Sequence, residues 1–353
     1  MLSQGPVIGV LKIMSQLPEL VQALLKPSSY PHSPQAVELR QTQMSFLLLT
    51  GDYVYKVKKA VDLGYLDYTT LERRRFFCHQ ELALNSRLCH GVYLEVVPIV
   101  RAGDVICVGG EGEVLEYAVK MRQLPLERMM DVLLDNNQVS QEMVREVAHR
   151  LAQFHQQAAS GDGISTYGDL DTVTHNVEEN FSQTQKYIGL SISAEKYRSI
   201  EAYTQGFIHR NSPLFRRPVD GGRIRDCHGD LHAAHVCFSD GICIYDCIEF
   251  NDRFRYCDVA SEIAFLAMDL DYHHRPDLSR AFVAAYVEMS RDDELGQLLD
   301  FYKCYRAYVR GKVESFKLDD PHISQERKRG TVAVARRYFE LAESYTGQKE
   351  VTN

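Results

Sequence analysis

The chain changes character near Pro125, and this change limits the folds that it can adopt. Up to that point, short apolar or alternating segments rich in β-forming residues are separated by turn signals. The strands predicted in this part are residues 37–43, 45–50, 53–58, 94–101 and 114–121. Beyond Pro125, apolar side chains recur at helical spacing, as in residues 143–159. A β-rich first part followed by a helical second part predicts an α+β fold with two lobes and a cleft between them.

Two helices are predicted within the β-rich part. Residues 18–26 place apolar side chains at helical spacing, and the step Lys26-Pro27 ends this helix because a residue before proline disfavours the helical conformation. Residues 70–88 form a second, charged helix with an apolar face. We therefore expect an N-terminal helical extension over residues 1–34, an N-lobe over residues 35–121 and a helical C-lobe over residues 122–353.

Charge and composition exclude several classes of protein. The net charge of -8 argues against a broad nucleic-acid interface, which needs a basic face. No window reaches about 18 consecutive apolar residues, so no membrane span is expected. The N-terminus has no basic stretch before a long apolar run, and the nine cysteines include no C-x-x-C pair, which favours reduced thiols. The sequence predicts a cytoplasmic protein without nucleic-acid or membrane partners, and it indicates no partner protein.

The most informative segment is His228-Gly-Asp-Leu-His-Ala-Ala-His235, which two apolar strands around Ser239-Asp-Gly241 connect to Asp246. Since a hairpin returns the chain to its starting point, we expect Asp246 to end close to Asp230 and His235. Two carboxylates brought together in this way can divide the work of phosphoryl transfer. One accepts a proton from an attacking hydroxyl, and the other holds the magnesium that neutralises the phosphates. The chain has neither G-x-x-x-x-G-K-[ST] nor G-x-G-x-x-G, so a phosphate site must be built in another way.

The same segment resembles the catalytic loop H-G-D-L-H-x-x-N of the aminoglycoside phosphotransferase and choline kinase superfamily. The likeness extends from about residue 37 to about residue 310 and is greatest to the uncharacterised bacterial branch described only as aminoglycoside phosphotransferase-like. The resemblance implies a protein-kinase-like bilobal fold, with a small, mainly antiparallel β N-lobe and a larger helical C-lobe that carries a catalytic β-hairpin. It also implies an enzyme that uses ATP and Mg²⁺ to phosphorylate a hydroxyl of a small molecule.

The resemblance assigns roles to individual residues. Asp230 would be the catalytic base or hydroxyl-orienting group, and Asp246 the principal magnesium ligand. Lys56 would contact the α- and β-phosphates and be positioned by Glu81. The remaining nucleotide contacts would come from the turn Thr42 to Ser45, whose backbone N–H groups and hydroxyls would cover phosphates, and from the hinge backbone of Met121 to Gln123, which would hold adenine.

One position departs from the family pattern. The asparagine that normally provides the second magnesium ligand is His235 in this chain. A neutral imidazole can bind a metal, but magnesium prefers oxygen ligands. His235 is therefore an altered metal ligand, a substrate contact or a mark of lost catalysis, and we favour the altered ligand.

Several other residues keep two interpretations. His228 and Asp258 are expected to support the catalytic loop, whereas His232 could contact substrate or stabilise the loop. Glu249 could assist the metal or line the pocket, and Glu81 could instead be a solvated helix residue. Lys58 and Lys59 compete with Lys56 for the nucleotide, because strand periodicity alone does not separate Lys56 from Lys58. The stripe of Lys303, Arg306 and Arg310 is either a solvated helix face or a basic wall for an anionic substrate.

Three classes of function remain after this reasoning. The first is a kinase for a small molecule with a hydroxyl group. The second is a nucleotide-binding pseudokinase that acts as a regulatory or interaction module, for which His235 is the main argument. The third is a metal-dependent phosphoesterase, which is disfavoured because the chain lacks the G-N-H-[ED] segment that would complete a two-metal site. Aminoglycoside resistance is not predicted, because a fold does not determine a substrate.

Overall fold

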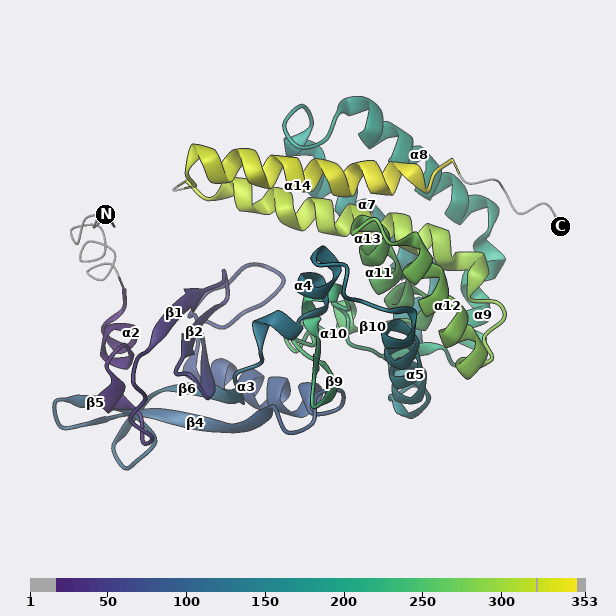
Figure 1. The fold of residues 1–353 in the computed structure, drawn as a ribbon. Helices are drawn as coiled ribbons and strands as arrows, with labels where there is room; N and C mark the ends of the chain where they lie inside the picture. The colour runs from purple at the N-terminus through teal and green to yellow at the C-terminus, as the bar shows by residue number, and fades with distance from the viewer. Residues whose placement is uncertain (1–16, 322, 348–353) are drawn as a thin grey trace. The chain divides into compact units, whose positions relative to one another are not determined.

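The computed structural model describes residues 17–321 and 323–347, which form two compact units (Figure 1). The sheet unit comprises the chain up to Pro125 together with Glu249–Asn251, and the helical unit comprises the rest. Of the predicted extension 1–34, residues 1–16 lie outside the described residues. The described part of it contains α2 (Glu19–Leu24) and a 3-10 turn at Pro27–Ser29.

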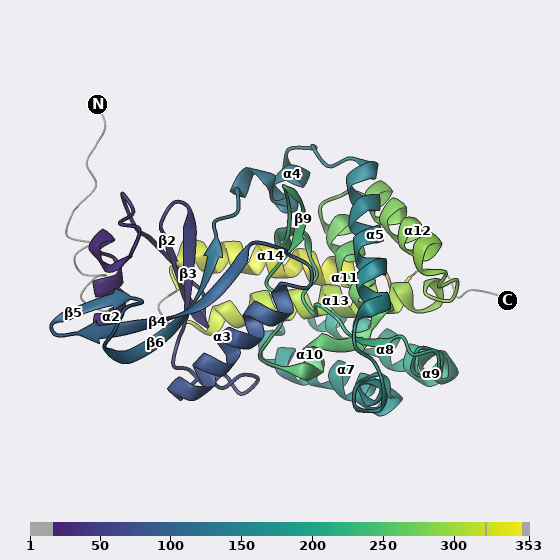
Figure 2. The ribbon, with the colours of Figure 1, turned by 90° about the horizontal axis from the view of Figure 1, so that it is seen from below.

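The sheet unit is built on six antiparallel strands in the order β1-β2-β3-β6-β4-β5. Helix α3 packs against β4 and β6 (Figure 2) and begins at Thr70, whose side chain accepts a hydrogen bond from the amide of Arg73. The elements are β1 (Glu38–Gln41), β2 (Ser45–Leu49), β3 (Tyr53–Lys58), α3 (Leu71–Asn85), β4 (Tyr93–Ala102), β5 (Val105–Val108) and β6 (Glu113–Arg122).

Strand β3 separates the apolar core of this unit from its charged side chains. Tyr55 and Val57 point into the core that also contains Leu24 of α2. Because successive side chains of a strand point to opposite faces, Lys56 and Lys58 must share the other face. The alternation of the sequence thus determines which face of the sheet carries the lysines.

The helical unit surrounds one central helix, α11. Every residue from Val259 to Leu270 of α11 is buried, and α12, α13 and α14 pack against it (Figures 1 and 2). The helices are α4 (Met130–Asp135), α5 (Gln141–Gln157), α6 (Asp162–Ser165), α7 (Leu170–Thr184), α8 (Ala194–Arg210), α9 (Ser212–Asp220), α10 (Asp252–Arg255), α11 (Val259–Tyr272), α12 (Pro276–Ser290), α13 (Gly296–Phe316) and α14 (Gln325–Ser344). Short 3-10 turns lie at Leu126–Arg128, Thr166–Gly168, Gln185–Tyr187, Ala233–His235 and Lys317–Asp319.

Two small antiparallel pairs lie among these helices. Strand β7 (Ile224–Asp226) pairs with β10 (Tyr256–Asp258), and β8 (Val236–Ser239) pairs with β9 (Gly241–Ile244). The second pair is the hairpin expected from the sequence. The α+β fold with an antiparallel sheet followed by a helical region is confirmed.

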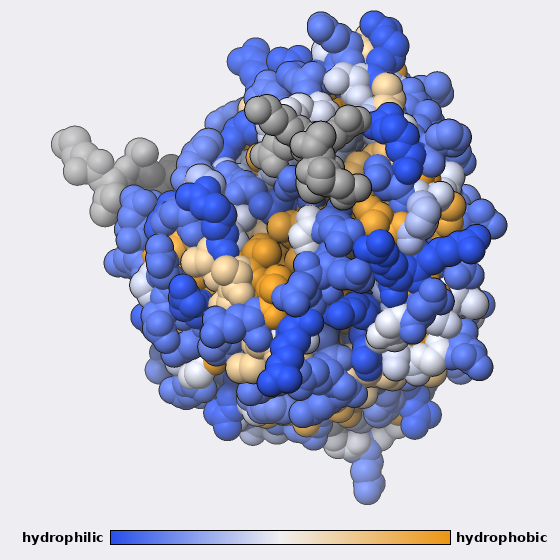
Figure 3. Space-filling model, turned by 90° about the vertical axis from the view of Figure 1, so that its right-hand side faces the viewer, coloured by the Kyte–Doolittle hydropathy of each residue, from blue (hydrophilic) through white to orange (hydrophobic). Residues whose placement is uncertain are grey.

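The surface and the cysteines complete the description. No helix in residues 17–321 or 323–347 combines the length and the apolar character needed to cross a membrane. Hydrophilic side chains predominate on the face drawn in Figure 3, and apolar side chains occur there in small groups. Cys78 and Cys304 are among the buried free cysteines.

Candidate active site

The β8–β9 hairpin determines where Asp246 lies. The 3-10 turn Ala233–His235 leads directly into β8, and the pairing continues beyond the end of β9, because the amide of Tyr245 donates to the carbonyl oxygen of His235 at 3.0 Å. Asp246 follows Tyr245, and its Oδ2 lies 3.6 Å from His235 Nε2. On the other side of the imidazole, Asp230 Oδ2 lies 3.6 Å from His235 Nδ1. The structure thus brings Asp230, His235 and Asp246 together.

Backbone conformation shapes both ends of this group. Asp246 has a φ of 62°, in the left-handed region that aspartate tolerates better than most residues. Gly229 has a φ of 87°, and a Cβ added there would lie 2.8 Å from the carbonyl oxygen of Phe254. Glycine is therefore required between His228 and Asp230, for its conformation and for the space around it.

The charge of Asp230 is stabilised by its neighbours. Burial alone would raise the pKa of its carboxyl, but His232, His235 and Arg310 together hold that pKa well below its usual range. The side chain is nevertheless 33% exposed, so it can still meet a ligand. His232 packs its ring 3.9 Å from that of His235 and is itself buried, which favours loop stabilisation over substrate contact.

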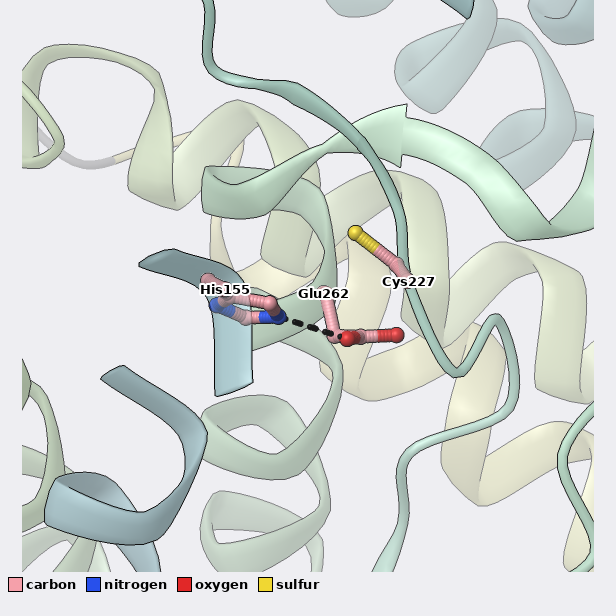
Figure 4. A group of neighbouring side chains, drawn as sticks. All are labelled: His155, Cys227 and Glu262. Atoms are coloured by element: carbon pink, nitrogen blue, oxygen red, sulfur yellow. Dashed lines mark hydrogen bonds and ion pairs between the residues drawn. The ribbon is translucent and has the colours of Figure 1, made fainter. Parts of the chain in front are cut away.

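A buried glutamate of α11 holds the backbone of the catalytic loop. Glu262 Oε1 accepts hydrogen bonds from the amides of His228 (2.8 Å) and Gly229 (2.7 Å), and its Oε2 lies 2.8 Å from His155 Nε2 (Figure 4). Two turns further along the same helix face, Asp269 Oδ2 accepts from the amide of Ala233 at 2.8 Å. The loop is therefore fastened at both ends to one helix.

The ionisation of Glu262 follows from these contacts. Burial alone would raise its pKa, but the hydrogen bond from His155, the charges of His155 and His228, and the amide of Gly229 outweigh burial and lower the pKa to about 2. Cys227 lies beside this pair, close enough for the three residues to resemble a metal site (Figure 4). The other ring nitrogen of His155, Nδ1, lies 2.8 Å from the hydroxyl of Tyr286, and Cys227 Sγ donates to the carbonyl of Cys257, so these polar atoms are used in structural bonds. The group supports the loop.

Sequence reasoning missed Glu262 and Asp269 as supports and gave that role to Asp258. Asp258 has a structural role at a different place, because it begins α11 and its Oδ1 accepts from the amide of Ala260 at 2.9 Å. Burial is the largest cause that raises the pKa of Asp258 to about 7. The signal that could have identified the true supports is that Glu262 and Asp269 lie seven residues apart, and so on one helix face, among mostly apolar residues. His228 was also predicted to support the catalytic loop. Its Nε2 lies 2.9 Å from the backbone carbonyl oxygen of Tyr245.

The prediction that the stripe forms a basic wall is wrong for its two buried residues, Lys303 and Arg306. Arg306 Nε contacts the carbonyl and hydroxyl of Ser261, and its Nη1 donates to the carbonyl of Gly229 at 3.3 Å. Lys303 donates to Asp271 at 2.9 Å. These two cations neither line a substrate wall nor form a solvated face, because the packing of α13 against α11 turns them inward. Arg310 contributes to the low pKa of Asp230, and its contact with substrate stays a prediction.

In the sheet unit, Glu81 binds two of the three candidate lysines. Its Oε1 lies 2.7 Å from Lys56 Nζ and its Oε2 lies 2.7 Å from Lys58 Nζ, and its side chain is fully buried rather than solvated. Lys58 also pairs with Glu249, which belongs to the same unit, and its side chain is only 1% exposed. Lys59 donates instead to the carbonyl of Thr42. Lys56, at 14% exposure, is the lysine of the Glu81 pair whose side chain reaches solvent.

The burial of Lys58 gives Glu249 a structural role. Burial alone would lower the pKa of Lys58, but Glu249 and Glu81 raise it well above its ordinary value, so the ammonium stays charged. Glu249 also accepts a hydrogen bond from Tyr68 at 2.6 Å. Its carboxylate therefore neutralises Lys58, and its assistance to the metal or its place in a pocket lining stays a prediction.

The phosphate turn and the hinge differ in part from expectation. The amides of Met44 and Ser45 both donate to Thr42 Oγ1, at 3.2 and 3.0 Å, so this turn satisfies its own N–H groups. Ser45 is also buried, which corrects its predicted contact with phosphate. At the hinge, Met121 is paired within the sheet and the amide of Gln123 donates to the carbonyl of Asp52 at 2.9 Å. Adenine binding by this segment stays a prediction.

Curated relatives share sequence with much of the chain. Uncharacterized proteins of Mycobacterium tuberculosis and Mycobacterium bovis are 33% identical to it over 279 residues, which is 79% of this chain and 54% of each relative. The chain thus spans about half the length of the curated relatives it matches. No family model matches the chain.

Solved structures of low sequence identity share its fold. Amicoumacin kinase, in complex with AMP-PNP, Ca²⁺ and its ligand, superposes with a TM-score of 0.52 at 11% identity, over 93% of this chain and 95% of that one. The GDP complex of an aminoglycoside 2'-phosphotransferase-IIIa gives 0.50 at 12% identity, over 95% and 97%. Ethanolamine kinase of Plasmodium vivax gives 0.50 at 9% identity, over 87% and 80%. The chain has the fold of the aminoglycoside phosphotransferase and choline kinase superfamily.

Proposed function

We propose that this protein is an ATP-dependent phosphotransferase that phosphorylates a hydroxyl of a small molecule. The observation that carries the proposal is the convergence of Asp230 and Asp246 on His235 at the end of the β8–β9 hairpin. The likeness in fold to kinases of small molecules supports the same class of reaction. The site is cytoplasmic in this proposal, and no nucleic acid or membrane takes part.

Asp230 is the residue that acts on the acceptor. Its carboxyl is ionised at neutral pH, because His232, His235 and Arg310 hold its pKa well below the usual range. A carboxylate can accept a hydrogen bond from the acceptor hydroxyl, orient its oxygen toward the phosphorus and accept its proton as the new bond forms. Glu262 and Arg306 keep the loop in place from below, so Asp230 needs little reorganisation when substrate binds.

The nucleotide is held through its phosphates. In this proposal Lys56, oriented by Glu81, contacts the α- and β-phosphates, while Lys58 maintains the buried charge balance with Glu249. A divalent cation bound at Asp246 would offset the negative charge of the phosphate oxygens. The oxygen ligand of Asp246 suits Mg²⁺, but the nitrogen ligand of His235 does not.

Lys56→Met is expected to remove at least about half of the stabilisation that ATP gives to the protein. A ligand present at a hundredfold excess over its Kd stabilises the folded state by about 2.7 kcal/mol, and a variant with at least tenfold weaker affinity loses about half of this. Thermal unfolding with and without ATP and a divalent cation measures the difference. Lys120→Met is the matched control, because Lys120 lies on the neighbouring strand and pairs with Glu95. Equal stabilisation by ATP in wild type and Lys56→Met would count against the assigned role of Lys56.

A screen of small hydroxyl-containing metabolites tests the reaction itself. The expected result is ADP formation that depends on one acceptor class, together with a phosphorylated product seen by mass spectrometry. ATP binding without transfer to any acceptor would instead support a pseudokinase. Phosphate release from a phosphoester without added ATP would support a phosphoesterase.

A further inference from the structure

We infer that His235 and Asp246 bind a first-row transition-metal dication, such as Mn²⁺, in preference to Mg²⁺. The inference rests on the proposed function, since the ion would be the one that accompanies the nucleotide phosphates. It departs from the magnesium expected for this fold because the chain presents a nitrogen ligand where an oxygen ligand is expected. Mixed imidazole and carboxylate ligands suit Mn²⁺, Fe²⁺, Co²⁺ and Zn²⁺ better than Mg²⁺.

The tautomer of His235 follows from its hydrogen bond. Nδ1 lies 2.9 Å from the backbone carbonyl oxygen of Asp230. A carbonyl oxygen can only accept, so Nδ1 carries the proton and Nε2 presents a lone pair. This is the arrangement of most metal-binding histidines, in which the second ring nitrogen donates to a carbonyl or carboxylate and so orients the ring.

The lone pair of His235 faces a second acceptor. Nε2 lies 3.6 Å from Asp246 Oδ2, a distance too long for a hydrogen bond. Neighbouring ligand atoms of one ion, with bonds of about 2.1 Å, lie roughly 3.0–3.4 Å apart. The observed separation is close to this range, and a small movement on binding would close the difference.

A second cluster of side chains at the loop is a weaker candidate for the metal site. Asp230, His232 and His235 also bring potential ligand atoms within 4.8 Å of one another. The distances of 3.6 Å in that group run from Asp230 Oδ2 to His232 Nε2 and to His235 Nδ1. Because Nδ1 already donates to the carbonyl of Asp230, it cannot serve as the ligand. The Nε2 side of the ring, toward Asp246, is therefore the metal side.

The pair is also held rigidly. The amide of Tyr245 donates to the carbonyl of His235, and the rings of His232 and His235 lie 3.9 Å apart. His235 is 14% exposed, so a small ion and phosphate oxygens can still reach it. A rigid pair of ligands discriminates between metals by ligand type, while phosphate oxygens and water complete the coordination in the proposed complex.

The test measures metal binding directly. The full chain is titrated with Mn²⁺, with and without AMP-PNP, and the free ion is followed by electron paramagnetic resonance. We expect that Mg²⁺ must be added in at least about tenfold excess to displace half of the bound Mn²⁺, and that His235→Asn reduces this preference by about tenfold or more. His273→Asn is the matched control, because His273 also faces an aspartate, Asp135, at 3.2 Å. It should leave the preference unchanged.

Isotope labelling keeps the test valid if His235→Asn does not fold. Wild-type protein made with ¹⁵N-histidine should replace the ¹⁴N coupling of bound Mn²⁺ by a ¹⁵N coupling in pulsed spectra. Displacement of Mn²⁺ by equimolar Mg²⁺, or a coupling unaffected by the label, would overturn the inference and leave the Lys56 test of nucleotide binding intact. Conversely, histidine coupling to Mn²⁺ with no phosphoryl transfer would sustain the metal site and reject the proposed function.

Discussion

Asp230→Asn is expected to lower the turnover of acceptor phosphorylation by about 10²–10⁴-fold, the range found when a general acid or base is removed. The amide has nearly the same shape but cannot accept a proton from the acceptor hydroxyl. The backbone carbonyl of Asp230, which accepts from His235 Nδ1, is unchanged by the substitution. ATP binding should therefore persist while transfer is lost. Steady-state ADP formation with the best acceptor of the screen, combined with ATP thermal shifts, measures both quantities.

Asp240→Asn provides the matched control for this experiment. Asp240 lies at the exposed turn of the β8–β9 hairpin, on the same loop-and-hairpin segment as Asp230. The control should keep wild-type turnover, because Asp240 lies at the turn, at the opposite end of the hairpin from His235 and Asp246. Turnover by Asp230→Asn within a few-fold of wild type would rule out a base or hydroxyl-orienting role for Asp230. Some other group would then have to activate the acceptor.

Local patterns in the sequence predicted the elements that carry this site. Short strand patterns predicted β1 to β4 and β6 to within one or two residues at most ends but not β5, and the turn Ser239-Asp-Gly241 predicted the β8–β9 hairpin. A hairpin is a local structure, so its two ends meet whatever the rest of the chain does. The proximity of Asp246 to His235 could therefore be expected before any tertiary contact was known.

Contacts between distant segments could not be predicted in this way. Glu262 is 34 residues from the His228 amide that it binds, and Arg306 is 77 residues from Gly229. Both contacts depend on how α11 and α13 pack, which helical periodicity does not specify. For the same reason, periodicity placed Lys56 and Lys58 on one face of the strand. It could not predict that Lys58 is buried and paired with two carboxylates.

Glu262→Gln is expected to lower the free energy of unfolding at pH 7 by about 3 kcal/mol. The pKa of Glu262 falls from 4.5 to about 2 on folding, and a shift of this size corresponds to about 3 kcal/mol in favour of the ionised, folded state. The amide of glutamine still fills the space but brings two N–H donors toward loop amides that need an acceptor. Urea denaturation of both proteins measures the difference. Glu288→Gln is the control, because Glu288 is exposed on α12, and it should change stability by less than about 0.5 kcal/mol.

The same substitution separates support of the loop from general stability through its pH dependence. Because folding lowers the pKa of Glu262, its contribution is complete above pH 4.5 and is lost as the pH falls toward 2. The stability difference between wild type and Glu262→Gln should therefore shrink over that interval, while the Glu288→Gln difference stays small throughout. If Glu262 positions the loop, the folded variant should also show a lower kcat with little change in the KM for ATP. A stability difference that is constant between pH 7 and pH 2.5 would show that the ionised carboxylate does not stabilise the loop that carries Asp230. A wild-type kcat would show that Glu262 does not position this loop.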